Sequence, residues 1–204
     1  MNKQAGFTLV EIAIVMVIIG LLLGGVLKGQ EIITNAKVKN LENDITGLTA
    51  AIYSYQDRYR YLPGDDGRAN RFAPQISCPT ECGDGNRKIG TVFDSTTDND
   101  ESRLFWLHLR NAGLVAGTTD DQAQPSNAFN GLTGVSTGLA ITGGANVPSH
   151  FVGFTDIPQG VAIIVESRGD DGVPTSGNVQ GAKNDGTAVT DYATDQLYQL
   201  YVSL

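Results

Sequence analysis

The segment GFTLVEIAIVMVIIGLLLGGVLKG, residues 6–29, decides the architecture of this chain of 204 residues. Between residues 7 and 27 it contains a single charged side chain, that of Glu11. As a helix rising about 1.5 Å per residue, this stretch would measure roughly 31 Å, the thickness of a bilayer's hydrocarbon core. We therefore expect a transmembrane helix over residues 7–27.

The charges that flank this helix predict its orientation. Lys3 precedes the apolar run, so the positive-inside rule places the N-terminus in the cytoplasm and the remaining chain across the membrane. An ordinary secretory signal fits poorly, because the apolar stretch is too long and no A-x-A-like cleavage site follows it.

The six residues that precede the run, MNKQAG, form a short charged leader that ends in glycine. They are followed by FTLVE and then by apolar residues or glycine throughout residues 12–25. This pattern closely resembles the processing signature of type IV pilins and type II secretion pseudopilins. The resemblance implies that a prepilin peptidase cuts after Gly6 and methylates Phe7. The apolar helix would then be retained as an anchor.

Glu11 needs an explanation, because a charged carboxylate costs about 2.5–3.5 kcal/mol near the centre of a membrane. Cleavage would create an amine on Phe7, one helical turn away, so the pair could form within one subunit. The resemblance implies instead that Glu11 meets the Phe7 amine of a neighbouring subunit. Only correctly staggered subunits would then neutralise both charges. A local alternative is interaction of Glu11 with the positive end of the helix dipole.

Glycines in the second half of the apolar run allow close contact between helices. Gly20 and Gly24, and likewise Gly25 and Gly29, have the GxxxG spacing of membrane helix interfaces. Many type IV pilins and pseudopilins, the proteins that this segment resembles, have proline at the position of Lys28. The departure here leaves open whether this stretch unwinds in an assembly.

Residues 28–62 change from uniformly apolar to amphipathic. One apolar stripe recurs at alternating spacings of three and four residues, as on one face of a helix. Pro63 and a Gly-Asp turn then end the pattern. We expect one long helix whose second half packs on a globular domain over residues 63–204, with an ordinary coiled coil as the alternative. The stripe comprises Val38, Leu41, Ile45, Leu48, Ile52, Tyr55 and Tyr59.

The sequence pattern of residues 63–204 predicts an α+β fold in which a small antiparallel sheet packs against the apolar stripe of the helix. Residues 101–112 have the pattern of a short helix that ends at Gly113. The segments 64–100 and 114–150 are rich in turn residues and predict loops. Strands are expected at residues 139–142, 150–154, 161–167 and 197–204, the last as an edge or closing strand.

Cys78 and Cys82 both follow the apolar helix, and in an oxidising compartment we expect them to form a disulfide. A structural zinc site needs about four ligands, and no histidine lies near in the sequence. Free thiols are the remaining alternative.

Two acidic turns repeat the letters GDDG, at residues 64–67 and 169–172. Glycine and aspartate are ordinary turn formers, so two plain turns are one interpretation. The other is calcium, which takes oxygen ligands from flexible loops. By resemblance to some secretion pseudopilins, we consider Asp170 and Asp171 as calcium ligands.

Charge and motifs exclude several classes of function. Residues 64–204 contain eight basic and seventeen acidic side chains, a balance that disfavours nucleic acid. The sequence contains no G-x-S-x-G, Walker A or H-E-x-x-H motif, and its two histidines are far apart. We therefore do not expect an enzyme.

The sequence predicts a structural subunit of a type IV pilus-like filament or a type II secretion pseudopilus. Its expected partners are other pilin-like subunits, a prepilin peptidase and the inner-membrane assembly machinery. Before assembly it would sit in the bacterial inner membrane with its head in the periplasm. The alternatives are a minor subunit near a tip that binds a surface, cargo or DNA, and an anchored module that never polymerises.

Overall fold

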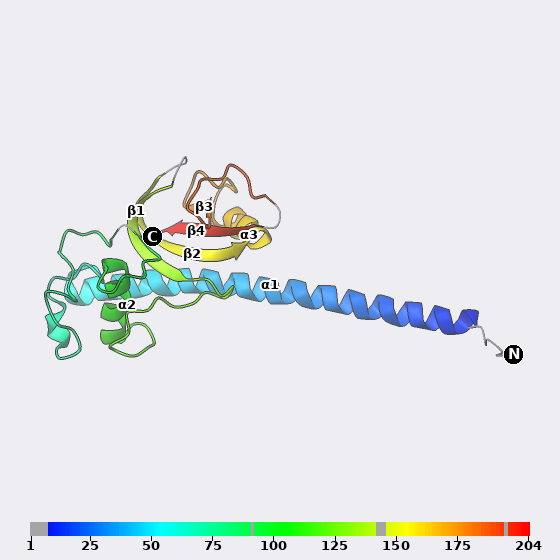
Figure 1. Cartoon of the computed structure of the whole chain (residues 1–204), viewed down its shortest axis with the longest axis horizontal. Helices are drawn as coiled ribbons and strands as arrows, with labels where there is room; N and C mark the ends of the chain where they lie inside the picture. The colour runs from blue at the N-terminus through cyan, green and yellow to red at the C-terminus, as the bar shows by residue number, and fades with distance from the viewer. Residues whose placement is uncertain (1–7, 91, 142–145, 194–195) are drawn as a thin grey trace.

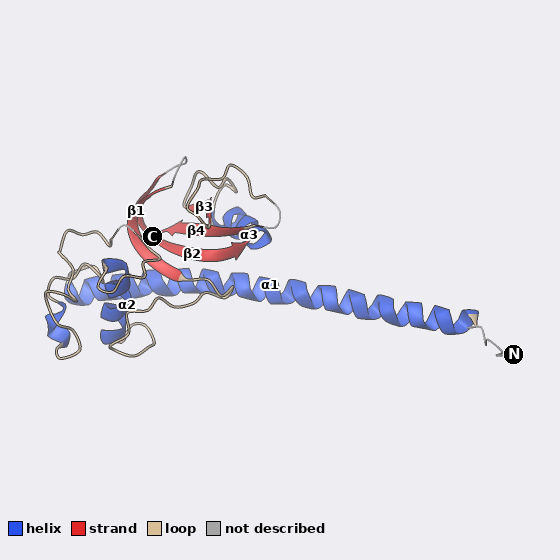
Figure 2. Cartoon of the chain, in the orientation of Figure 1, coloured by secondary structure: helices blue, strands red, loops and turns tan. Residues whose placement is uncertain are grey.

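A computed structural model describes residues 8–90, 92–141, 146–193 and 196–204, and it shows one long helix with a head at its C-terminal half (Figure 1). The head combines a small antiparallel sheet with short helices (Figure 2). The predicted α+β fold is therefore confirmed.

The long helix α1 (Leu9–Tyr59) begins at the N-cap Thr8 and ends at Arg60, whose φ of 65° is left-handed. It continues unbroken through the glycines between residues 20 and 29. The predicted stripe is confirmed, because its members are buried or partly buried in the main core of the head. By contrast, the side chains of residues 9–27 are exposed all around the helix. The two halves of α1 therefore have different surroundings.

The sheet has four strands in the order β1-β2-β4-β3, all antiparallel. The register aligns one valine from each strand in a row, Val135, Val152, Val202 and Val179. All four belong to the same core cluster as the α1 stripe, so this face of the sheet packs towards the helix. The strands are β1 (Thr133–Ala140), β2 (Asn146–Pro158), β3 (Val179–Lys183) and β4 (Leu197–Ser203).

The opposite face of the sheet carries a smaller core built around Phe93. Its ring meets Phe151 and Tyr201 edge-on, at centroid distances of 6.1 and 5.6 Å. Phe93 lies so close to Gly134 and Gly153 that a Cβ on either glycine would clash with it. A loop residue thus covers the sheet where two glycines leave room for it.

The predicted strand at residues 161–167 is wrong, because this segment belongs to helix α3 (Gln159–Gly169). Pro158 ends β2 and serves as the N-cap of α3. The buried residues then follow helical spacing, with Val161, Ala162 and Val165 inside and Ile163 42% exposed. A short apolar run alone does not distinguish a buried strand from a buried helix.

Other expectations for the head also need correction. The predicted loop over residues 114–150 contains β1 and the start of β2, which are longer than the expected strands at 139–142 and 150–154. Strand β4 lies between β2 and β3, so it is central and not an edge or closing strand. Strand β3, which forms an edge, was not predicted.

The short helix expected at residues 101–112 is confirmed as α2 (Glu101–Asn111). Trp106 and His108 on this helix are buried. The expected loop over residues 64–100 also contains a 3-10 turn, η1 (Ala69–Phe72).

Candidate functional site

The start of α1 places Glu11 in a capping box with Thr8. The Oε2 atom of Glu11 accepts hydrogen bonds from the backbone N–H and the hydroxyl of Thr8, at 2.8 and 2.7 Å. In return, the Glu11 N–H donates to the Thr8 hydroxyl over 3.3 Å. This reciprocal arrangement satisfies donors that would otherwise be orphaned at the helix start. Within one chain, Glu11 therefore acts locally at the N-terminus of the helix.

The capping box leaves the charge of Glu11 without a cation among the residues described. Its side chain is exposed, and the second carboxylate oxygen has no hydrogen bond in this part of the chain. The predicted processing residues Gly6 and Phe7 lie outside the described residues. The pairing of Glu11 with a Phe7 amine therefore stays a prediction.

The apolar half of α1 is the one described helix long and apolar enough to cross a membrane. Leu9 is 91% exposed and Leu21 73%, values that an apolar side chain rarely has in a water-soluble core. Around Gly20, Gly24, Gly25 and Gly29 the space is open, so another helix can approach the backbone. This surface is suited to lipid or to neighbouring helices.

A buried polar network connects the C-terminal end of α1 to the loop that follows it. The Asp66 carboxylate accepts a hydrogen bond from the Tyr55 hydroxyl of α1 at 2.6 Å. The same carboxylate forms a two-pronged ion pair with Arg71. Asp66 is fully buried, so this half of the first acidic turn is a structural element.

The predicted disulfide between Cys78 and Cys82 is present, with the two Cα atoms 5.2 Å apart. His108 ties this loop to the end of α1. Its Nδ1 accepts the Gly64 N–H at 3.0 Å, and its Nε2 faces the Glu81 carbonyl at 3.0 Å. The proton therefore sits on Nε2, and burial lowers the pKa of His108, so the ring is neutral. His108 is a structural residue in this geometry.

The turn that holds Asp170 and Asp171 is closed by its own hydrogen bonds. Asp170 accepts the N–H groups of Asp171 and Val179, at 2.6 and 2.8 Å. Asp171 accepts the Val173 N–H at 2.9 Å and the Ser176 hydroxyl at 2.7 Å. Each of the four carboxylate oxygens thus has a partner within the loop, as in the plain-turn interpretation. Calcium binding by these two residues stays a prediction.

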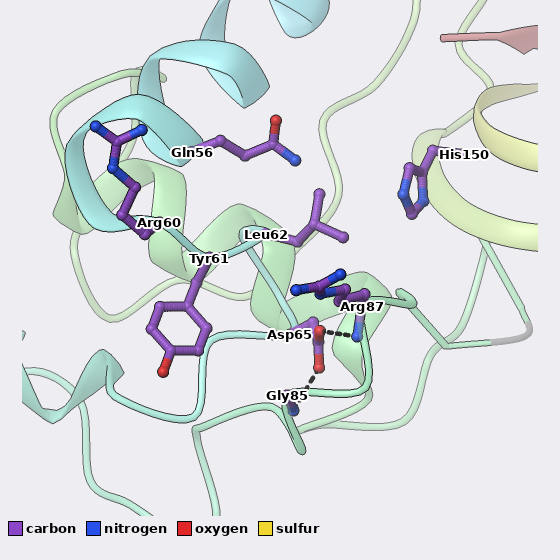
Figure 3. A pocket seen from close by; sticks show the side chains of 8 residues that line it. All are labelled: Gln56, Arg60, Tyr61, Leu62, Asp65, Gly85, Arg87 and His150. Atoms are coloured by element: carbon purple, nitrogen blue, oxygen red, sulfur yellow. Dashed lines mark hydrogen bonds between the residues drawn. The ribbon is translucent and has the colours of Figure 1, made fainter.

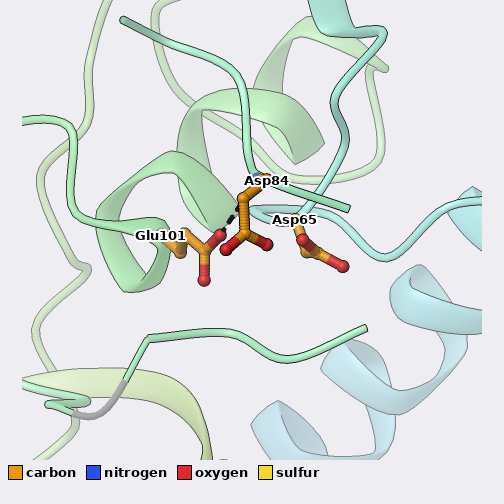
Figure 4. A group of neighbouring side chains, drawn as sticks. All are labelled: Asp65, Asp84 and Glu101. Carbon is orange, nitrogen blue, oxygen red and sulfur yellow. Dashed lines mark hydrogen bonds between the residues drawn. The ribbon is translucent and has the colours of Figure 1, made fainter. Parts of the chain in front are cut away.

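A different group of carboxylates meets where the first acidic turn approaches α2 (Figure 4). Oxygen atoms of Asp65, Asp84 and Glu101 all lie within 4.8 Å of one another. Burial raises the pKa of Asp65 and of Glu101, although both accept backbone hydrogen bonds. The sequence did not indicate this group, because its members come from three separate segments. The repeated GDDG letters pointed only to Asp65.

Next to this group, a cavity of about 540 Å³ opens at the C-terminal end of α1 (Figure 3). Arg60 and Arg87 line it, and both have left-handed backbones, with φ of 65° and 67°. His150, also in the wall, is 2.6 Å from the Thr137 hydroxyl through its Nδ1. Among the described residues that line it, no nucleophile is paired with a base.

Comparison with known proteins identifies a family motif in the N-terminal segment. Residues 1–27 match the family described as the prokaryotic N-terminal methylation motif. Neither the curated proteins nor the solved structures gave a match. The motif covers the leader, Glu11 and the apolar half of α1, the same residues that carry the resemblance seen in the sequence. This chain therefore carries the signature of type IV pilin-like proteins and pseudopilins, which are structural and not catalytic proteins.

Proposed function

We propose that this protein is a filament subunit of a type IV pilus-like or pseudopilus assembly. A prepilin peptidase removes residues 1–6 and methylates Phe7, and the inner-membrane machinery then extracts the anchored subunit from the bilayer. Before assembly, the N-terminus faces the cytoplasm and the head faces the periplasm. The observation that carries the proposal is the exposed apolar half of α1 with Glu11 in its first turn, inside the matched motif.

The physical reason for assembly is the surface and charge of this half-helix. Its apolar side chains have no partner among the residues described, so either lipid or other subunits cover them. The Glu11 charge is tolerated best next to a cation in such a medium, where low dielectric strengthens the attraction. The amine that cleavage creates on a neighbouring Phe7 is such a cation. Neutralisation of both charges then favours a fixed stagger between subunits.

Substitution of Glu11 by glutamine separates its two roles. Glutamine can still complete a capping box, but it removes the charge. We expect Glu11→Gln, like Glu11→Leu, to abolish filaments while membrane insertion and removal of the leader are unchanged. Sheared filaments, membrane fractions and the mass of the N-terminal peptide are the measurements. Glu31→Leu, which changes a carboxylate beyond the predicted span that pairs with Lys28, is the matched control and should assemble normally.

Two results would count against this function. Normal filaments from Glu11→Gln would mean that the capping role suffices and that no charge pairing occurs. A mature chain that still begins at Met1 would remove the proposed processing altogether. Labelled subunits along a filament would support a main subunit. A label confined to one end would instead favour the minor subunit that binds a surface, cargo or DNA.

Calcium binding by Asp170 and Asp171 is a separate proposal with its own test. Calcium prefers carboxylate and carbonyl oxygens in flexible loops, and this turn offers two carboxylates. Thermal unfolding of the detergent-solubilised chain would be followed with a calcium chelator and after calcium is restored. A transition that rises with calcium in the wild type but not in Asp171→Asn supports the proposal. If calcium leaves the unfolding temperature of the wild type unchanged, the proposal is wrong. If only Asp84→Asn abolishes the rise, calcium binds at the group of Asp65, Asp84 and Glu101 instead.

A further inference from the structure

A second cavity, of about 400 Å³, lies beside α1 on the side of α2. Asn43, Asp44 and Gly47 of α1 form one wall, and apolar residues such as Leu114 and Val115 form another. Trp106 also lines it. The Nε1 donor of this tryptophan has no hydrogen-bond partner among the described residues, although the side chain is only 1% exposed. Buried polar atoms without partners are rare, so one residue of the cavity wall carries a donor for which the described residues offer no acceptor.

Tyr53 is the exposed aromatic residue on the other side of α1. It is 62% exposed and lies beside His150 and Ile89, next to the sheet. At about 100° per residue around a helix, Tyr53 points about 180° away from Asp44 and about 80–140° away from the other α1 residues that line the cavity, Asn43, Gly47 and Leu48. A protruding tyrosine and a cavity therefore occupy opposite flanks of the same helix. Such a pair cannot meet within one chain, but it can meet between parallel chains.

We propose that Tyr53 of one subunit inserts into the cavity lined by Trp106 and Asp44 of a second copy of this chain. The inference rests on the proposed filament. Tyrosine fits this cavity chemically, because its ring can pack against the apolar wall while its hydroxyl donates to the Asp44 carboxylate. Exposed tyrosines that enter pockets are frequent energetic centres of protein interfaces.

The stagger implied by Glu11 agrees with this contact. If Glu11 meets the Phe7 amine of the next subunit, that subunit is displaced by about four residues, or roughly 6 Å, towards the head end. Helical side chains lean towards the N-terminus, so the Tyr53 ring lies about one turn before its own Cα, near the level of residue 49. In the displaced subunit this level corresponds to about residue 45. The α1 wall of the cavity, which includes Asp44 and Gly47, surrounds that position.

Because each chain offers the tyrosine on one flank and the cavity on the other, the contact is heterologous and repeats from subunit to subunit. Heterologous contacts that do not close into a ring generate helical filaments. Both copies point the same way along the axis, since both are anchored through the same end in one membrane. The head thus contributes its own assembly contact in addition to that of the apolar helix.

Cysteine cross-linking in full-length, membrane-expressed protein tests the contact directly. We expect Thr49→Cys combined with Asn43→Cys, which leaves Tyr53 in place, to give a ladder of disulfide-linked multimers of this chain. The matched control combines Thr49→Cys with Thr46→Cys, two positions on the Tyr53 side of α1. It should remain monomeric. A ladder in both, in neither, or only to a different subunit would overturn the proposal.

Two substitutions that leave the monomer intact provide a second test. Tyr53→Ala empties the contact, and Ala116→Phe fills the cavity from an exposed position in its wall. Each should lower filament yield by about tenfold or more, the effect of a central interface residue, without moving the unfolding transition of the solubilised monomer. Normal filament yield in both variants, with loss in Glu11→Gln, would refute this contact alone. Normal yield in Glu11→Gln would refute the proposed charge pairing instead.

Discussion

The two halves of α1 have the same backbone but opposite surroundings. Leu9 is 91% exposed and the apolar residues after it remain exposed, whereas Val38 and Tyr55 in the second half are completely buried. The second half packs against the sheet and α2 of its own chain. The first half has no such partner among the residues described. In the proposed filament its partners come from lipid or from other subunits, so substitutions in the two halves should affect different measurements.

Matched leucine substitutions give the largest test of this difference. Leu41→Ala removes a side chain that is 1% exposed in the main core, and we expect a loss of about 3–5 kcal/mol in the free energy of unfolding. Leu22→Ala removes the same atoms from an exposed position and should leave head unfolding unchanged. Denaturation of the solubilised chain can be followed through Trp106, its single tryptophan. Equal losses in both variants would contradict the division of α1.

The link between the head and the end of α1 should be nearly as sensitive. Asp66→Ala leaves the Tyr55 hydroxyl and Arg71 without their shared acceptor, and removal of one partner from a buried ion pair is strongly destabilising. Because Arg71 can still reach water, we expect a loss of about 3 kcal/mol in chemical denaturation. Asp57→Ala, at an exposed position on α1, is the control and should change stability little. A minor effect of Asp66→Ala would show that the network is dispensable.

Each half of the molecule also contains a carboxylate in apolar surroundings. Glu11 lies in the exposed apolar half of α1, and Glu166 of α3 is fully buried in the head, where its oxygens have no hydrogen-bond partner among the described residues. Burial raises the pKa of Glu166 to about 7, and the nearby charges of Asp170 and Asp171 add to the effect. The head therefore contains a carboxyl group that remains protonated well above the usual range of glutamate.

This raised pKa predicts that the head loses stability as the pH rises. Between the ordinary glutamate pKa, 4.5, and about 7, the folded chain binds more protons at Glu166 than the unfolded chain does. The stabilisation is thus complete below pH 4.5 and is lost by about pH 7, with a magnitude of order 2–3 kcal/mol. Glu166→Gln should remove this part of the pH dependence and be more stable than wild type at pH 7.5. Unfolding curves at several pH values measure it, and an unchanged pH slope would exclude Glu166 as its source.

The sequence predicted the parts of the fold that depend on local spacing. The α1 stripe follows from apolar residues three and four positions apart, and α2 from its pattern and the glycine after it. Helix α3 was missed because the run at residues 161–165 is apolar throughout and shows no period. The central place of β4 depends on pairing with β3, a short strand from a glycine-rich segment. Such pairings are set by tertiary contacts.

The candidate sites also differ in whether the sequence alone could indicate them. Glu11 was evident because a single charge interrupts an apolar run. Asp65, Asp84 and Glu101 were not, since only folding brings carboxylate oxygens from these three segments to within 4.8 Å of one another. Tyr53 and its proposed cavity also depend on the fold, because the cavity has walls from α1, from α2 with the loop that follows it, and from the start of β1. The spacing of residues along one helix cannot predict a surface that several separate segments of the chain form together.

The smallest predicted effect concerns the point where α1 ends. Arg60 has a φ of 65° and caps the helix through its N–H, which donates to the Gln56 carbonyl at 2.8 Å. Glycine adopts this left-handed conformation without the strain imposed by a Cβ atom. Arg60→Gly should therefore stabilise the head by about 0.5–1 kcal/mol, despite the loss of an exposed ion pair with Asp57.

Arg58, two residues earlier, provides the opposite case. It lies within the last turn of α1, where glycine costs about 1 kcal/mol because it loses more backbone conformational freedom on folding than other residues do. Arg58→Gly should therefore destabilise the head, and the two midpoints in denaturant should move in opposite directions from wild type. If both variants lose stability, the left-handed position of Arg60 is held by its side chain, which lines the cavity next to Arg87, and not by the backbone hydrogen bond alone. The sign of this small difference then tells whether the helix stops at Arg60 for a local reason or because the head requires an arginine there.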